Sequence, residues 1–446
     1  MDQLLLLLHA GAGNLAAYLA GHVLLCLLPA FFIAGAMTAL IPRSSVTRWL
    51  GRDAPARVSY PAAALAGSLI AVCSCTIVPL FAGIHRKGAG LGPAICFLFF
   101  APAGNVMALA YTGSILGPRF AVARLVLCLV FGVGIGVLMG AMFRGDDARQ
   151  GAPLANDDAR MDSASLGLLL ALLALLVTGT LKLWPLTATL CAVDLPVPGA
   201  LAWQARLLEW VPFDAASGEE GVSVQGSVLI ALMALLGISA WRGLEGIIEG
   251  ANTWTLAAMV LACLTLLFAT LRLEPHAAGL RVVFTGRTLA VAISAWAVWR
   301  SACRLLPEQS RNWLWEAWRF VKQIFPLLVA GVFVVGMART LIRPEWIEAM
   351  SGSNTLSANA IAVGFGVFMY FPTLVEVPVA RMFLDLGMHP GPLLAYLMAD
   401  PELSLQSMLM VSAVIGRRKT AAYVGLVAAF SICAGLLYGA WIDMAL

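Results

Sequence analysis

The stretch from Ile70 to Asn105 decides the fold, and it reads I-A-V-C-S-C-T-I-V-P-L-F-A-G-I-H-R-K-G-A-G-L-G-P-A-I-C-F-L-F-F-A-P-A-G-N. Two cysteines, Cys73 and Cys75, stand in an apolar segment ahead of Pro79, and a second apolar segment is interrupted at Pro102 to Asn105. Proline removes a backbone donor and clashes with the preceding turn, so both segments predict broken helices. Helices broken at membrane depth line cavities or are buried in protein. Polar groups there indicate a functional site. We therefore expect a transport site.

The composition is that of a membrane protein. Of the 446 residues, 61% are hydrophobic and 12% are charged, and the mean hydropathy is +0.89. A soluble domain has about 25% charged residues. Long unbroken apolar blocks predict helical spans and not the alternating segments of a β-barrel. We expect an all-α, polytopic transmembrane helical bundle with roughly twelve spans in a lipid bilayer. Nothing in the composition indicates a nucleic-acid partner.

An internal repeat relates the two ends of the chain. Six glycine and proline positions of the N-terminal part recur at a constant offset of 299 residues. They are Gly67, Pro79, Gly88, Pro93, Pro102 and Gly117, matched by Gly366, Pro378, Gly387, Pro392, Pro401 and Gly416. Duplicated halves with paired broken helices point to the binding site of a transporter. The spacing predicts two repeated four-helix units, at 1–145 and 311–446, around an inserted middle region, 146–310, with about four spans. Parallel and inverted orientations of the units both remain open.

Cys73 and Cys75 are the strongest candidate for chemistry among the nine cysteines. The other seven are scattered singly. This distribution is typical of free cysteines, which pack like small hydrophobic residues. Thiolates are soft ligands and prefer thiophilic metals and, by the same logic, trivalent metalloids. On a continuous helix the two side chains would be about 200° apart. We therefore expect an unwound backbone near Pro79 if they share a ligand, and the alternative is two buried core cysteines.

The corresponding segment of the second half contains a carboxylate in place of the two thiols. Glu376 lies near the position of Cys75, in an apolar run that ends at Pro378. A carboxylate there is costly and usually faces a cavity or a partner. Glu376 is therefore either a proton-coupling group or the structural partner of an arginine, such as Arg381 or Arg124.

The second break also carries acidic residues. Asp400, Pro401 and Glu402 replace Ala101-Pro102-Ala103. We expect the two breaks to meet and to place Asn105 and these carboxylates around one cavity. The alternative for Asp400 is a cap on the following half-helix. The histidines show no metal-ligand spacing, no nucleotide-binding loop is present, and no cofactor is expected.

The chain resembles a family of predicted permeases that includes the organoarsenical efflux permeases, often called the ArsP family. The resemblance lies in C-S-C-x-x-x-P-L-x-x-G-I from Cys73, G-A-x-L-G-P-A-x-x-F-L from Gly88, P-A-x-N from Pro102 and G-x-x-x-G-P-x-x-A-Y-L-x-x-x-P from Gly387. It covers about the first 145 and the last 130 residues. It implies a secondary permease of the inner membrane, with Cys73 and Cys75 as substrate contacts and, for some members, export of trivalent organoarsenicals.

We therefore interpret the chain as a multi-pass inner-membrane permease, not an enzyme, that exports a small thiophilic solute. Trivalent arsenicals are the first candidate substrate, and a proton is the candidate coupling ion. A soft-metal-ion transporter is the first alternative. A membrane redox protein that uses Cys73 and Cys75 as a dithiol is the second, and a structural subunit is the third. The predicted site comprises Cys73, Cys75, Pro79, Pro102, Asn105, Glu376, Pro378, Asp400, Pro401 and Glu402, with both cysteines as candidate metal or metalloid ligands.

Overall fold

The computed structural model describes residues 2–20, 23–51, 54–69, 74–145, 162–180, 184–211, 221–276, 279–339, 351–368 and 373–445. These ranges are mainly helical and contain one small antiparallel sheet. Within them, seven helices are long and apolar enough to cross a membrane, and four shorter helices are also apolar. The predicted polytopic helical architecture is confirmed, whereas the number of spans stays a prediction.

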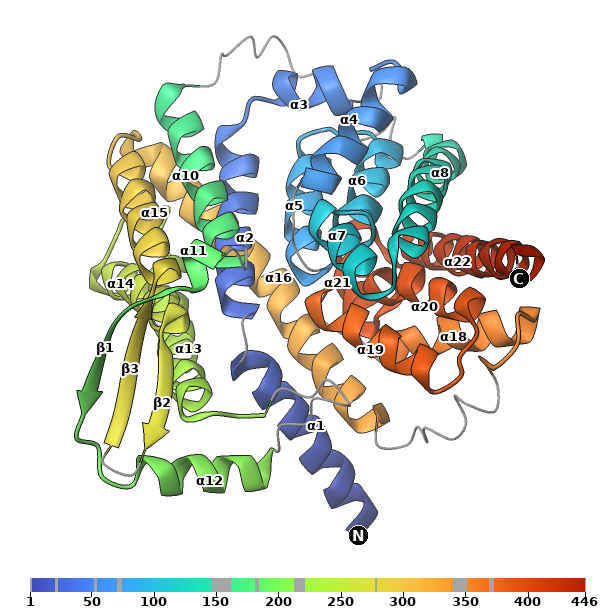
Figure 1. Ribbon diagram of the computed structural model, residues 1–446. Helices are drawn as coiled ribbons and strands as arrows, with labels where there is room; N and C mark the ends of the chain where they lie inside the picture. Colours follow the sequence, from blue (N-terminus) through green and yellow to red (C-terminus); the bar gives the residue numbers. More distant parts are fainter. Residues whose placement is uncertain are drawn as a thin grey trace.

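Two groups of helices lie together on the right of Figure 1. The first group consists of α4 (Ala56–Leu69), α5 (Ser74–Arg86), α6 (Leu91–Ala103), α7 (Val106–Ile115) and α8 (Pro118–Met142). The second consists of α18 (Leu356–Phe368), α19 (Thr373–Asp385), α20 (Pro390–Leu403), α21 (Leu405–Ile415) and α22 (Arg417–Ala445). Every residue of α6 is buried, as is every residue of α20 after Pro390. A helix that is apolar and buried on all sides lies at the centre of a bundle, and α6 and α20 contact each other there.

The bounds of these helices recur along the chain. Helices α5 and α19 begin and end 299 residues apart, and α6, α7 and α8 each begin 299 residues before α20, α21 and α22. The turns recur as well, because Gly88 and Gly387 have φ angles of 95° and 92°, and Gly117 and Gly416 have 99° and 85°. Only glycine adopts such angles at little cost.

Contacts between the groups are reciprocal. Helix α7 packs on α19, and the corresponding pair α21 and α5 pack on each other. Within each group the long helix crosses the buried helix at a pair of glycines. A Cβ atom added to Gly92 would lie 2.8 Å from the Gly136 carbonyl oxygen, and one added to Gly391 would lie 2.8 Å from the Gly435 carbonyl oxygen. Small residues at such crossings let two backbones approach closely in a membrane.

One predicted helix break is confirmed and another prediction needs correction. Helix α6 ends at Ala103 and α7 begins at Val106, so the chain breaks within the predicted Pro102–Asn105 segment. Pro79, by contrast, lies inside α5, which runs without interruption from Ser74 to Arg86. Proline is tolerated in a membrane helix where neighbouring groups satisfy the freed backbone. Helix α4 ends at Leu69 and α5 begins at Ser74. Residues 70–73 between them lie outside the described ranges.

The middle of the chain forms the left-hand part of Figure 1. Its helices are α10 (Ser163–Thr180), α11 (Trp184–Thr187), α12 (Ala200–Trp210), α13 (Val224–Leu244), α14 (Thr253–Thr270) and α15 (Gly286–Ala302). The all-α prediction missed a sheet of three short strands here, in the order β1-β3-β2. The strands are β1 (Thr189–Leu195), β2 (Arg272–His276) and β3 (Gly279–Thr285). Strands β2 and β3 directly follow and precede apolar helices, so hydrophobicity alone does not separate these short strands from the helices beside them.

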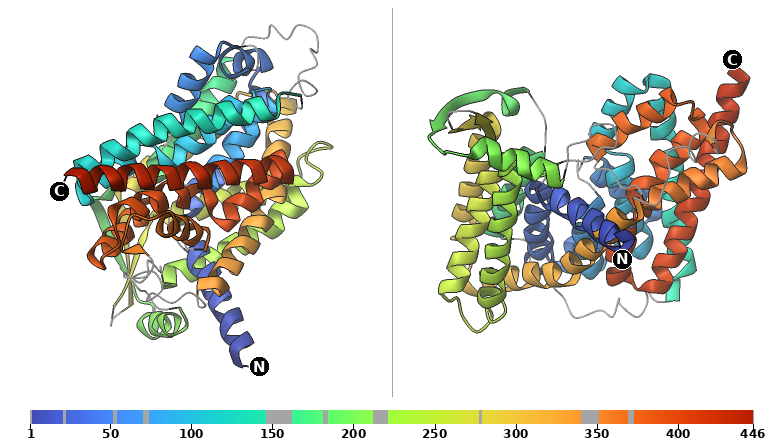
Figure 2. Two further views of the ribbon diagram at one scale, coloured as in Figure 1. Left: turned by 90° about the vertical axis from the view of Figure 1, so that its right-hand side faces the viewer. Right: turned by 90° about the horizontal axis from the view of Figure 1, so that it is seen from below.

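Three N-terminal helices and one long helix complete the fold. They are α1 (Asp2–Ala20), α2 (Val23–Leu40), α3 (Arg43–Leu50) and α16 (Pro307–Arg339). Helix α16 runs between the left-hand and right-hand parts in Figures 1 and 2, and it packs on α1, α2 and α21. Its Trp313 and Trp318 are buried, and their indole nitrogens donate to the Phe32 carbonyl and the Glu245 carboxylate, both at 2.8 Å. Burial with a satisfied N–H is the usual state of a core tryptophan.

The glycine crossings give the first testable prediction. Valine at Gly136 or Gly435 has no room, so each variant should lose about 1–3 kcal/mol of stability through overpacking. The two losses should be similar because both glycines face a glycine carbonyl of the crossing helix. Thermal unfolding of the purified protein in detergent measures the effect. Gly425→Ala is the control, because a Cβ there meets nothing within 4 Å; an equal loss in the control would contradict the prediction.

Candidate functional site

The site is built on the break between α6 and α7. Asn105 is the N-cap of α7, and its side-chain oxygen accepts a hydrogen bond of 2.8 Å from the backbone N–H of Ala108. Its amide nitrogen donates to the carbonyl oxygens of Ala101 (2.8 Å) and Pro102 (3.2 Å). Asparagine is favoured at this position because it satisfies a backbone donor that the helix leaves without a partner. The amide of Asn105 therefore holds the break together, and its role as a substrate contact stays a prediction.

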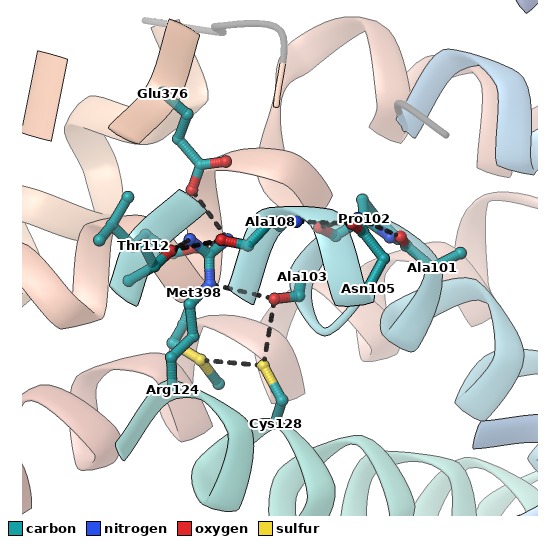
Figure 3. A network of polar contacts seen from close by, with 11 residues as sticks. Ala101, Pro102, Ala103, Asn105, Ala108, Thr112, Arg124, Cys128, Glu376 and Met398 are labelled. Carbon is teal, nitrogen blue, oxygen red and sulfur yellow. Dashed lines mark hydrogen bonds and ion pairs between the residues drawn. The ribbon is translucent and has the colours of Figure 1, made fainter. Parts of the chain in front are cut away.

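Arg124 of α8 points into the break and binds four groups. Its Nε donates to the Ala103 carbonyl at 3.0 Å, and its first terminal nitrogen donates to the Thr112 hydroxyl at 3.1 Å. The second terminal nitrogen reaches Glu376 at 3.1 Å and the Leu397 carbonyl at 3.4 Å. Figure 3 shows how these contacts converge on the guanidinium. A planar group with five donors in a fixed fork suits such a network.

Glu376 of α19 completes the ion pair from the other group of helices. Both side chains are 0% exposed, and the pair joins residues 252 positions apart in the sequence. Of the two arginines expected as partners of Glu376, Arg124 forms the ion pair, whereas Arg381 pairs with Asp385 at 3.0 Å on an exposed helix face. A role of Glu376 in proton coupling stays a prediction. The second oxygen of Glu376 has no hydrogen-bond partner among the described residues. Taking two charges out of water costs several kcal/mol per ion. The close contact of the pair and the further hydrogen bonds of Arg124 offset this cost.

Two sulfur atoms meet beside the same break. The Cys128 thiol, one turn after Arg124, lies 3.4 Å from the Met398 thioether and 3.5 Å from the Ala103 carbonyl. Both side chains are buried, and they come from the two different groups of helices. The contact is also drawn in Figure 3. Thiol and thioether sulfurs are soft ligands, although the same residue types also pack well in apolar cores.

Glu402 of α20 has a hydrogen-bond partner different from that of Glu376. Its carboxylate accepts a hydrogen bond from the Tyr423 hydroxyl, and its other oxygen has no partner within the described ranges. Both residues are buried, with exposed fractions of 3% and 1%. Asp400 is 0% exposed and lies inside α20, so the interpretation of Asp400 as a helix cap is wrong. The N-cap of α21 is Ser404.

The other predicted site residues are partly outside the described structure. Cys73 lies outside the described ranges, and Cys75 lies in the first turn of α5 with its side chain not described. Pro378 lies in α19, also with its side chain not described. Pro102 and Pro401 are buried near the C-terminal ends of α6 and α20. The sharing of one ligand by Cys73 and Cys75 therefore stays a prediction. Across the described residues, no group of three or more His, Cys, Asp and Glu side chains is placed to hold a metal ion.

The structure brings two further residues, Arg124 and Tyr423, to the centre of the molecule. The sequence indicates Arg124 only as one possible partner of Glu376. An ionisable residue in an apolar span is a strong functional signal by itself, and Arg124 is the only charged residue between Phe120 and Phe143. Tyr423 carries no such signal, and its position 299 residues after Arg124 is the pattern that would have found it.

The fold is that of a helical membrane protein with a polar site buried between two groups of helices. A family model described as "Predicted permease" matches residues 9–440, so the chain belongs to this family. A protein of Methanocaldococcus jannaschii named "UPF0718 protein MJ0584" is 29% identical over 444 residues, which cover 98% of each chain. The "UPF0718 protein YraQ" of Escherichia coli is 31% identical over 100 residues, or 22% of this chain and 28% of that protein. No solved structure matches. The multi-pass membrane location follows from the family together with the apolar helices.

The buried ion pair gives a second prediction. Arg124→Met should lower the free energy of unfolding by about 3–5 kcal/mol, because it leaves the Glu376 charge buried without its cation. Adding Glu376→Leu should recover much of this loss, since an apolar pair can replace a buried ion pair. The double-mutant cycle should therefore show a strong interaction energy. Denaturant unfolding of the purified protein measures all three variants.

The exposed pair Arg381–Asp385 provides the matched control for this cycle. Exposed pairs four residues apart on a helix contribute only about 0.3–0.5 kcal/mol. Similar interaction energies at the two pairs would contradict the conclusion that burial sets the strength of the Arg124–Glu376 interaction.

Proposed function

We propose that the chain is a secondary permease of the inner membrane that moves its substrate between two repeated units, residues 1–145 and 311–446, and that residues 146–310 are an insertion. The recurring helix bounds, the turns with positive φ and the reciprocal contacts support the duplication. The buried Arg124–Glu376 pair carries the functional proposal, because it joins the two units at a helix break. A polar contact at such a place must rearrange when one unit moves against the other.

The proposed substrate is a small thiophilic solute, with trivalent organoarsenicals as the first candidate and export as the direction. The resemblance of the Cys73–Ile84 segment to organoarsenical permeases supports this choice. The contact between the sulfurs of Cys128 and Met398 supports it independently, because it places two soft ligands beside the break. The same soft ligands suit a soft metal ion, which is the second candidate.

The proposal is tested by flux into inside-out membrane vesicles. The panel contains a trivalent methylarsenical, arsenite, silver ion and a pentavalent arsenical, and accumulation of the trivalent organic compound is expected in vesicles that contain the protein. A dithiol redox protein would instead show a reversible Cys73–Cys75 disulfide without flux of any of these compounds. No transport of the trivalent arsenicals or silver would overturn the thiophilic assignment.

The two cysteines give a third prediction. If Cys73 and Cys75 chelate one soft atom, Cys73→Ser, Cys75→Ser and the double variant should all lose transport of the trivalent arsenical to a similar extent. Each loss should be roughly tenfold or more, or about 1.4 kcal/mol of transition-state stabilisation. Cys433→Ser is the control, because this cysteine is exposed on α22. Small and additive losses of transport would contradict the prediction and indicate that Cys73 and Cys75 are structural residues without a shared ligand.

A further inference from the structure

Tyr423 takes the place that Arg124 has in the first group of helices. Each residue lies seven positions after a glycine with positive φ, Gly416 or Gly117, and each is fully buried. Arg124 donates from Nε to the Ala103 carbonyl, and Tyr423 donates from its hydroxyl to the Glu402 side chain. Ala103 and Glu402 are themselves 299 residues apart. The two groups therefore share one arrangement. In each, a side chain of the long helix, α8 or α22, donates a hydrogen bond to the C-terminal end of the buried helix, α6 or α20.

The charges of the two arrangements differ. In the first, Arg124 supplies a cation, which neutralises Glu376 across the interface. In the second, Tyr423 supplies a neutral hydroxyl to a carboxyl group. No ion pair to Glu402 is present in the described part of the chain, and its Oε1 has no hydrogen-bond partner there. An ionised carboxylate without a cation is strongly unfavourable in a buried site.

The ionisable groups on the neighbouring helices do not supply the missing cation. Helix α20 packs against α6, α8, α18, α19, α21 and α22. The guanidinium of Arg124 is bound to Glu376, and the Lys419 ammonium lies 5.8 Å from the centre of the Phe143 ring. The remaining buried ionisable groups described on these helices are acids, phenols or thiols, namely Cys96, Cys128, Glu376, Tyr396, Asp400, Tyr423 and Tyr438. The exposed charges on these elements are Arg119, Arg381, Asp385, Arg417, Arg418 and Asp443.

We infer that Glu402 is a proton-binding site of this protein: its buried carboxyl group holds a proton in the state described here, and the Tyr423 hydroxyl orients it. With the proton on Oε1, Oε2 is the carbonyl oxygen that accepts from Tyr423. Releasing the proton leaves a carboxylate that needs water, so loading and unloading require Glu402 to reach an aqueous side. The role of this site in coupling transport to a proton gradient rests on the proposed permease function, whereas the bound proton itself does not.

Infrared spectroscopy of the full chain in lipid nanodiscs tests the bound proton without any substrate. At neutral pH we expect the wild-type protein to show a protonated-carboxyl band, and Glu402→Gln to lose one component of it. Glu376→Gln and the exposed control Asp385→Asn should retain that component. Tyr423→Phe should keep the component but shift its frequency, because the carboxyl loses its hydrogen bond.

A charge-swap variant sharpens this test. Tyr423→Arg places a cation where the first group has Arg124, so Glu402 should ionise and its band should disappear while the protein stays folded. An unchanged band in Glu402→Gln would overturn the inference. Loss of the wild-type band on adding sodium ion at constant pH would overturn it too, because the site would then bind sodium ion.

Flux measurements separate this inference from the proposed function. In proteoliposomes, an imposed proton gradient should increase the wild-type rate of transport of the trivalent methylarsenical. In Glu402→Gln this increase should be roughly tenfold smaller. If no substrate is transported but the infrared result holds, the permease proposal fails and the proton site stands. If transport proceeds and Glu402→Gln responds to the gradient as the wild type does, the permease stands and the coupling role fails.

Discussion

The ion pair between Arg124 and Glu376 constrains the centre of this molecule. Both side chains are fully buried, and they come from helices on opposite sides of the interface between the two groups. A guanidinium in that position needs every donor satisfied, and the break after Ala103 supplies a carbonyl oxygen that a continuous helix would have used internally. The helix break and the position of α19 are therefore linked through Arg124, because the break supplies the Ala103 carbonyl and α19 supplies the Glu376 carboxylate.

Helices with matching bounds and turns have different side chains at corresponding positions in the two groups. The glycine crossings and the turns with positive φ allow the same close helix packing in both groups. Side chains at corresponding positions then need only to fit the space, and their charges can differ. Arginine in one group and tyrosine in the other produce one carboxylate with a cation and one carboxyl without a cation.

The sulfur contact between Cys128 and Met398 connects this centre to the proposed substrate class. It touches the same Ala103 carbonyl that Arg124 binds, so soft ligands and the ion pair share one break.

The sequence by itself determined the membrane class, the family and the break at Pro102 to Asn105, because hydrophobic blocks, motifs and prolines are local signals. It also marked Glu376 as a carboxylate that needs a partner or a cavity. It did not determine that Pro79 lies inside a continuous helix, because a membrane helix accepts proline when neighbouring groups satisfy the backbone. Nor did it predict the three-stranded sheet, whose strands adjoin apolar helices. The choice of Arg124 as the partner of Glu376 and the pairing of Glu402 with Tyr423 were decided only by the tertiary structure. Both join helices that are separate in the sequence, and only packing in three dimensions sets which charges meet.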